Sequence, residues 1–460
     1  FAGGDDEEQS NWGTPAQDAR KGLIGRFNYD YKGKYLAEFS FRYDGSLKFH
    51  PDRRWGFFPS VSLGWRLSEE AFMKKFSNLD NLKVRGSYGI LGNDAVGGWQ
   101  WLTNYSFGNA YIFNQAPIKS IVSGGIPNVD LTWEKTATFN FGVDASIYKG
   151  LLAVEADVFY KRTYDILGSR NASMPQTFGA TLPSENYGIV KVKGFELQVK
   201  HDNKIGDFRY HVGGNVSWSR NKVIEKDYAA GAEPWNIPVG KTMGYRACFV
   251  ALGLFQSDEE AAAWPRFKGT QPTAGDVKYA DLNNDGIMDE RDKKVVSPYS
   301  NTPEIMFGLN LSASWKGFDF SALFQGAANR NVMLSGFATQ MFINGASNLP
   351  KYLYEDHWTP DNRDARYPKA WGPDHPSNNK SSTFWLINGN YVRLKNVELG
   401  YSISKDLLSR VGVDRLRIYV GGSNLFSIDH MPGYDPEKQD GGPNYYPQQR
   451  VFNMGVNITF

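Results

Sequence analysis

Apolar and polar residues alternate along much of the chain with a period of two. In residues 136–147 the odd-numbered positions, from Ala137 to Ile147, are apolar, and the even-numbered positions are small or polar. Because successive side chains of a β-strand point to opposite faces, this pattern predicts a strand with one apolar and one polar face. A second alternating run follows the short connection 149–150, and the pair predicts a hairpin.

The same alternation recurs to the end of the chain and predicts about thirteen strands. Their expected ranges are 21–31, 34–44, 56–67, 81–91, 132–148, 151–166, 188–201, 207–222, 303–316, 317–328, 389–403, 414–427 and 450–460. Most of these ranges are long enough for a tilted membrane strand, which needs about 9–11 residues. Strands of soluble proteins are usually shorter, at about 5–6 residues.

Two interpretations of these strands compete: a soluble sandwich or barrel, and a transmembrane antiparallel β-barrel. Tyr and Trp residues lie at the ends of the apolar stripes, as the aromatic girdles of a membrane barrel require. Examples are Tyr31, Tyr35, Trp65, Tyr148, Tyr160, Trp218, Trp315 and Tyr401. Short and long connections also alternate, as they do between the periplasmic turns and external loops of such barrels. These features favour the all-β membrane barrel.

The alternation of connections predicts the orientation in the membrane. If the last strand ends at the periplasm, every short turn lies there, and the long loops near 92–131, 223–302 and 329–388 lie outside the cell. Bacterial single-chain barrels have even numbers of strands, whereas thirteen is odd. We therefore expect further strands outside this chain, so that residues 1–460 form only a part of one barrel.

Composition excludes several classes of protein. The 460 residues include 1 Cys, which rules out an intrachain disulfide scaffold. The net charge of +2 gives no signature of nucleic-acid binding. No apolar run approaches the roughly 20 residues of a membrane helix. The chain starts at Phe1 without an initiator Met or a signal peptide, so we expect it to be processed, cut or incomplete.

Several stretches carry a resemblance to a known family. They are WGFFPSVSLGWRLSEE at 55–70, LKVRGSYGILGN at 82–93, LTWEKT at 131–136, GDVKYADLNNDG at 275–286, GFDFSALFQG at 317–326, YVRLKNVELGY at 391–401 and the strand that ends in Phe460. With these motifs in order, the chain resembles the C-terminal barrel portion of a SusC/RagA-type TonB-dependent outer-membrane transporter. The resemblance extends from about residue 20 to the end.

This resemblance implies a 22-stranded barrel in the outer membrane of a Gram-negative bacterium, with an N-terminal plug inside it. It also implies a SusD-like lipoprotein over the external mouth, and uptake of oligosaccharides or oligopeptides driven through TonB. The chain departs from the family by lacking the plug, the TonB box and roughly the first nine strands. Its expected partners are therefore that N-terminal part, TonB, the lipoprotein, the membrane lipid and the substrate, but no nucleic acid.

One external loop has the spacing of an EF-hand calcium loop. Oxygen donors stand at loop positions 1, 3, 5, 9 and 12, Gly286 stands at position 6, and a backbone carbonyl is available at position 7. The candidate Ca²⁺ ligands are Asp281, Asn283, Asp285, Ile287, Asp289 and Asp292. Position 12 is Asp rather than the usual Glu, and no helices are predicted on either side. The alternative is an acidic, Gly-containing surface turn. The role of the ion would be to rigidify the loop 223–302.

The external loops are also rich in aromatic rings, on which a sugar or a peptide side chain can stack. The candidate substrate-binding residues are Trp99, Trp101, Trp358, Tyr445 and Tyr446. For any one of them, packing within a loop or contact with the lipoprotein is the alternative, because most pocket lining is structural.

The sequence holds no catalytic signature. P-loop, GxGxxG, GxSxG, HExxH and CxxC motifs are absent, and the 6 His residues have no metal-ligand spacing. We therefore expect a transporter and not an enzyme. A passive outer-membrane porin is the second interpretation, and a secreted all-β glycan-binding protein is the alternative from another class.

Overall fold

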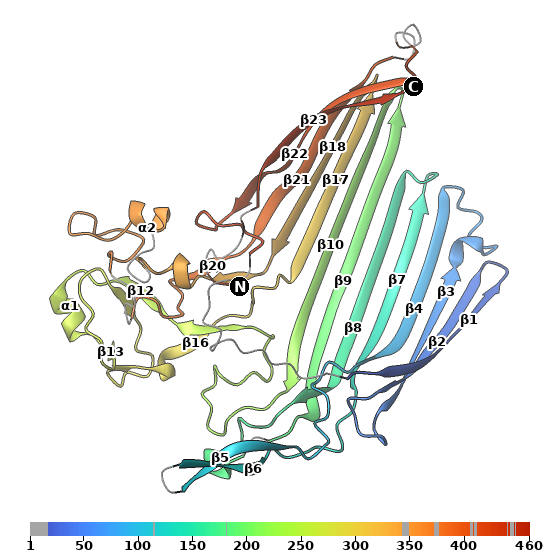
Figure 1. The fold of residues 1–460 in the computed structure, drawn as a ribbon. Helices are drawn as coiled ribbons and strands as arrows, with labels where there is room; N and C mark the ends of the chain where they lie inside the picture. The colour runs from blue at the N-terminus through green and yellow to red at the C-terminus, as the bar shows by residue number, and fades with distance from the viewer. Residues whose placement is uncertain are drawn as a thin grey trace, which may run out of the picture.

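A curved antiparallel sheet of thirteen strands forms the body of the protein (Figure 1). The computed structural model describes residues 17–460 apart from 114–115, 181, 343–348, 372–376, 405–407, 409–411, 439, 442–445 and 447. Each strand of this sheet pairs with the strand of the same sheet that follows it along the chain. The strands are β1 (Arg20–Tyr31), β2 (Tyr35–Ser46), β3 (Trp55–Arg66), β4 (Leu79–Asn93), β7 (Glu134–Ile147), β8 (Leu152–Gly168), β9 (Glu185–Ile205), β10 (Phe208–Glu225), β17 (Ile305–Trp315), β18 (Phe318–Ala328), β21 (Tyr391–Ser402), β22 (Arg415–Asp429) and β23 (Val451–Thr459). All thirteen strands expected from the alternation are thereby confirmed.

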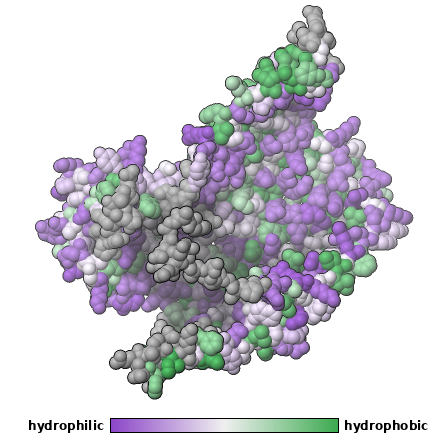
Figure 2. Space-filling model, in the orientation of Figure 1, coloured by the Kyte–Doolittle hydropathy of each residue, from purple (hydrophilic) through white to green (hydrophobic). Residues whose placement is uncertain are grey.

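The two faces of this sheet differ in polarity. In the pairing of β7 with β8, Phe141 lies opposite Val158, and the neighbouring pair, Gly142 and Asp157, lies on the other face. Phe141 and Val158 are 43% and 52% exposed, so their face has no protein against it within the described residues. Figure 2 shows the other face, over which mainly hydrophilic residues are spread. An exposed apolar face on long strands is what a wall in contact with lipid requires.

The long connections gather at one end of the sheet and contain small elements of their own (Figure 1). The first holds the hairpin β5 (Tyr105–Phe113) and β6 (Ala116–Ser123). The second holds β11 (Arg246–Phe249), β12 (Ala251–Leu254), α1 (Asp258–Ala263), β13 (Arg266–Phe267), β14 (Val277–Tyr279), β15 (Ile287–Met288) and β16 (Lys293–Ser297). The third holds β19 (Asn331–Met333), α2 (Lys351–Glu355) and β20 (Leu386–Asn388). Short 3-10 turns lie at Leu67–Glu69, Gln176–Phe178, Glu290–Asp292 and Gly336–Ala338.

Most of the buried apolar residues lie in or near these connections. The largest cluster has Trp385, which is 1% exposed, beside Leu353, Met341 and Tyr367 in the third connection. A second cluster joins Phe249 to Val277, Tyr279 and Met288 in the second connection. The loops therefore fold around cores of their own at one end of the sheet.

The sheet has two edges whose strands have only one neighbour each. Among the described residues, β1 pairs with β2 alone and β23 pairs with β22 alone. Each edge therefore presents a row of backbone N–H and C=O groups without a ladder partner. None of the helices in the described part of the chain has the length and apolar character of a membrane span.

A matched pair of substitutions tests which face is in contact with lipid. We expect Phe141→Arg to lower the free energy of unfolding from lipid vesicles by about 2–4 kcal/mol, the cost of an Arg near the bilayer midplane. The neighbouring substitution Asn140→Arg points to the polar face, and we expect it to leave stability nearly unchanged. Equal losses for the two variants, measured by urea titration of the full-length protein, would contradict this assignment of faces.

Candidate functional site

A cavity of about 780 Å³ lies on the polar side of the sheet, and its lining extends to the long connections. Its polar lining comes from several strands and from two loops. It includes Asp157, Glu196, Gln198, Asn215, Ser217, Gln325, Arg330 and Glu437. Carboxylate, amide and hydroxyl groups of this kind form hydrogen bonds with polar solutes. Tyr391 adds an aromatic ring to the same wall.

Part of the polar face is fixed by ion pairs between neighbouring strands. Arg85 on β4 donates from Nε to Asp144 on β7 over 3.1 Å, and from Nη1 to Asp157 on β8 over 2.6 Å. Farther along the sheet, Arg417 Nε donates to Asp319 over 3.0 Å. Asp144 and Asp157 share the cation of Arg85, and Asp319 has Arg417, so these cations offset much of the negative charge on the wall.

The loop after β22 is clamped onto the wall by two arginines. Arg393 on β21 is 4% exposed and lies 2.9 Å from Asp435. It also lies 3.0 Å from Glu437, in an ion pair without hydrogen-bond geometry. Arg330 donates to the carbonyl oxygens of Pro436 and Lys438 over 2.6 Å each. Burial lowers the pKa of Arg330.

This clamp could not be predicted from the sequence. Arg393 and Asp435 are far apart along the chain, and each residue alone resembles an ordinary solvated charge. The only indication of the clamp in the sequence is that Arg393 falls on the polar side of a strand. In the structure it lies directly opposite Ser427 of β22.

Trp99 and Trp101 lie together in the first long connection. Their ring centroids are 6.0 Å apart, and the ring of Trp101 meets His50 edge-on at 5.3 Å. Both side chains are half-buried. Trp99 has a φ of 65°, in the left-handed region that costs a non-glycine residue roughly 1–2 kcal/mol. The structure therefore brings these two predicted residues into one aromatic group.

The other three predicted substrate residues do not join this group. Trp358 is 7% exposed and packs against Gly275, where an added Cβ would lie 2.5 Å from its ring. It therefore has a packing role in the third connection. Tyr446 is 81% exposed, and its hydroxyl accepts a hydrogen bond from Gln449 over 2.8 Å. Tyr445 lies outside the described residues.

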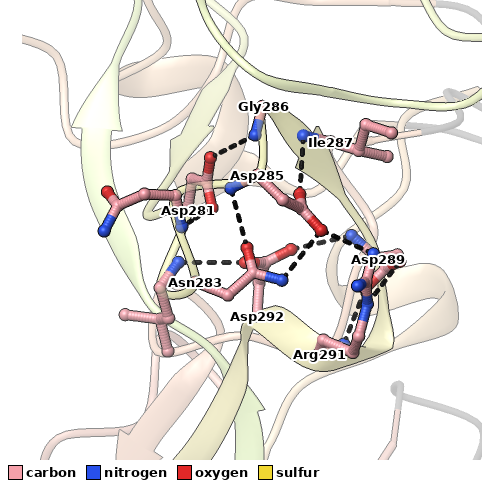
Figure 3. A network of polar contacts seen from close by, with 10 residues as sticks. Asp281, Asn283, Asp285, Gly286, Ile287, Asp289, Arg291 and Asp292 are labelled. Carbon is pink, nitrogen blue, oxygen red and sulfur yellow. Dashed lines mark hydrogen bonds and ion pairs between the residues drawn. The ribbon is translucent and has the colours of Figure 1, made fainter.

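The predicted calcium loop is closed largely by its own hydrogen bonds (Figure 3). Asp281 accepts from the amides of Asn284 and Gly286 over 2.7 and 2.9 Å. Asp285 accepts from the amide of Ile287 over 3.0 Å. Asp292, which is fully buried, accepts from the amides of Leu282 and Asp289.

A guanidinium stands among the carboxylates of this loop. Arg291 lies 2.5 Å from Asp285 and 2.8 Å from Asp289, and its hydrogen bonds lower the pKa of Asp289 (Figure 3). Among the described residues, no group of three or more His, Cys, Asp or Glu side chains is arranged to hold a metal ion. The calcium site at Asp281, Asn283, Asp285, Ile287, Asp289 and Asp292 stays a prediction.

The arrangement of strands and loops can be compared with known proteins. Residues 2–425 match the family model described as "TonB dependent receptor-like, beta-barrel". The chain belongs to this family. It is 29% identical to TonB-dependent receptor P26 of Formosa agariphila and 26% identical to TonB-dependent receptor SusC of Bacteroides thetaiotaomicron, over 95% of its own length in both cases. These alignments cover 46% and 43% of the two relatives, so the chain spans less than half of their length.

A solved structure supports the same fold. The chain is similar to a chain in the structure of the RagAB peptide importer in its "open-open" state, with a TM-score of 0.76 at 23% identity. The match covers 97% of this chain and 47% of that one. The resemblance to the barrel portion of SusC/RagA-type transporters is therefore confirmed, as is the outer-membrane location, and the relatives named above are TonB-dependent receptors rather than enzymes. A secreted glycan-binding protein is set aside.

Loss of the clamp should release the loop that follows β22. We expect Arg393→Ala to destabilise the docked loop by about 1–3 kcal/mol, because it removes the cation that lies 2.9 Å from the buried Asp435, whereas Glu437 keeps Lys395 at 2.8 Å. The measurement is proteolysis of residues 429–440 in the full-length protein. Arg42→Ala, which removes an exposed arginine, is the control and should leave the cleavage rate unchanged. Equal protection of the loop in both variants would contradict the clamp.

Proposed function

We propose that this chain forms part of an outer-membrane importer that takes up oligosaccharides or oligopeptides by a TonB-dependent mechanism. The observation that carries the proposal is the polar cavity of about 780 Å³ on the wall, toward the end with the long loops. A cavity of this size matches the usual range of binding sites for small molecules. Its hydrogen-bonding groups suit hydroxyls and amides alike, so glycans and peptides both stay candidates.

The proposed partners follow from the same architecture. The open edges of β1 and β23 need further strands, because an unpaired backbone is costly in hydrocarbon. We infer that an N-terminal barrel part supplies them and carries the plug and the contact with TonB. A SusD-like lipoprotein over the external loops is proposed from the similarity of this chain to SusC and to a chain of the RagAB importer.

A passive porin is the competing function. It would use the same wall and the same polar lining, but solutes would diffuse through it without energy. The dependence of uptake on TonB therefore separates the two functions.

Uptake in cells tests the proposal and the role of the paired rings. Labelled oligosaccharides and oligopeptides are offered to cells that make the full-length transporter and its lipoprotein, with and without TonB. We expect accumulation of one class of substrate, and the loss of this accumulation without TonB.

The same uptake assay tests the paired rings. We expect Trp99→Ala combined with Trp101→Ala to weaken the apparent affinity for the substrate by about tenfold, since each aromatic contact contributes about 0.5–1.5 kcal/mol.

The control for this experiment is Phe76→Ala, which removes an exposed ring from a short turn at the opposite end of the sheet. Its uptake should equal that of the unchanged protein. Accumulation that persists without TonB would favour the porin. Unchanged affinity in the double tryptophan variant would remove these rings from the substrate site.

We also propose that the loop 281–292 binds Ca²⁺ and thereby stiffens the second long connection. Its spacing supports the proposal, whereas the guanidinium of Arg291 competes with a cation for Asp285 and Asp289. We therefore expect Arg291→Ala to bind Ca²⁺ more tightly than the unchanged protein, and Asp281→Asn to bind it more weakly. Calorimetry on the full-length protein measures both, and Lys268→Ala is the control. An absence of Ca²⁺ binding in the Arg291→Ala variant would overturn this site.

A further inference from the structure

Basic residues gather on the apolar side of the sheet, at the external ends of β8, β9 and β10. The pairing of the strands places Arg162 opposite Lys191, and Lys191 opposite Lys222. Lys193 is two residues from Lys191 along β9, so it projects from the same side. Residues that are directly opposite in a sheet share a face. These four cations, Arg162, Lys191, Lys193 and Lys222, therefore form one patch, called the basic patch below.

The basic patch lies directly beyond the aromatic end of the apolar stripe. Tyr160 lies opposite Lys193, and one step toward the middle of the sheet Phe195 lies opposite Trp218. Tyr160 and Phe195 are 41% and 39% exposed, as rings in contact with lipid would be. Because aromatic girdles mark the membrane interface, the patch lies at the height of the polar headgroups of the outer leaflet.

The charges of the patch are not balanced by the protein. Among the described residues, the structure shows no ion pair for Arg162, Lys191, Lys193 or Lys222. The neighbouring Arg220 differs, because it binds Glu304 over 2.7 Å at two oxygens. Four cations held together without counter-charges produce a positive potential that attracts an anion.

The patch also borders a hollow of sufficient size for a headgroup. A cavity of about 570 Å³ is lined by Lys191, Lys193 and Lys222, together with Tyr160 on the strand side. Tyr245 and Pro298 of the second long connection line the same cavity. A ligand there would meet cations, rings and the edge of the apolar stripe at once.

We propose that the basic patch binds the phosphorylated sugar headgroup of an outer-leaflet lipid. The lysine ammonium groups would hold phosphate oxygens as point charges, and the acyl chains would lie along Val158 and Phe195. A lipid is favoured over a free phosphate because the cations continue into an exposed apolar stripe, which a soluble anion would not need. Such a lipid would also fix the loop that lines the cavity.

Binding of purified lipid A to the full-length transporter in detergent tests the proposal. The three probes are diphosphorylated lipid A, dephosphorylated lipid A and inorganic phosphate, with retention measured by native mass spectrometry. Each basic residue near an anionic surface contributes about fivefold to binding. We therefore expect the combined variant Lys191→Gln, Lys193→Gln and Lys222→Gln to bind diphosphorylated lipid A about a hundredfold more weakly.

The matched control changes the same number of lysines at the opposite end of the sheet. Lys32→Gln, Lys149→Gln and Lys316→Gln remove exposed charges from three short turns and should leave binding unchanged. Heat-modifiable gel mobility checks that both variants are folded. The proposal is overturned if the two variants bind lipid A equally, or if dephosphorylated lipid A binds as tightly as the phosphorylated form. It is also overturned if inorganic phosphate displaces the lipid at an equal concentration.

Discussion

The need of every backbone N–H and C=O group for a partner in hydrocarbon determines the rest of this structure. Water is absent there, so a chain that crosses the membrane as strands must satisfy these groups through neighbouring strands. The thirteen-stranded ladder meets this need along most of its interior, with interruptions at bulges such as the one between Leu394 and Asn396. Because side chains then alternate between faces, the same ladder provides an apolar outer surface and a polar inner one from a single run of residues.

The strands could be predicted from the sequence because their pattern is local. The strand Glu134–Ile147 was expected at 132–148, since its alternation sets both its faces and its ends. Within the loops this signal is missing. The strands Arg266–Phe267 and Ile287–Met288 pair in parallel over two residues each, which is too short for a period to be recognised. Their positions follow from packing around Phe249 and Tyr279, which unites distant segments.

The candidate site shows the same division between local and distant information. Spacing alone identified the acidic loop, but it did not reveal that Arg291 lies between Asp285 and Asp289. Residue type alone made Trp358 a candidate for substrate contact, whereas burial against Gly275 gives it a packing role. A ring in a loop has the same identity whether it lines a chamber or fills a core, and only the folded structure distinguishes the two cases.

The two open edges of the sheet have a consequence for how such a chain reaches its membrane. An exposed edge strand is a template on which another strand can add, including a strand from a second copy of the same chain. β1 and β23 each offer such a template as long as no further strand pairs with them. The interval between synthesis and closure is therefore the period of greatest risk of aggregation. A chaperone that covers these edges before insertion would protect the chain through that interval.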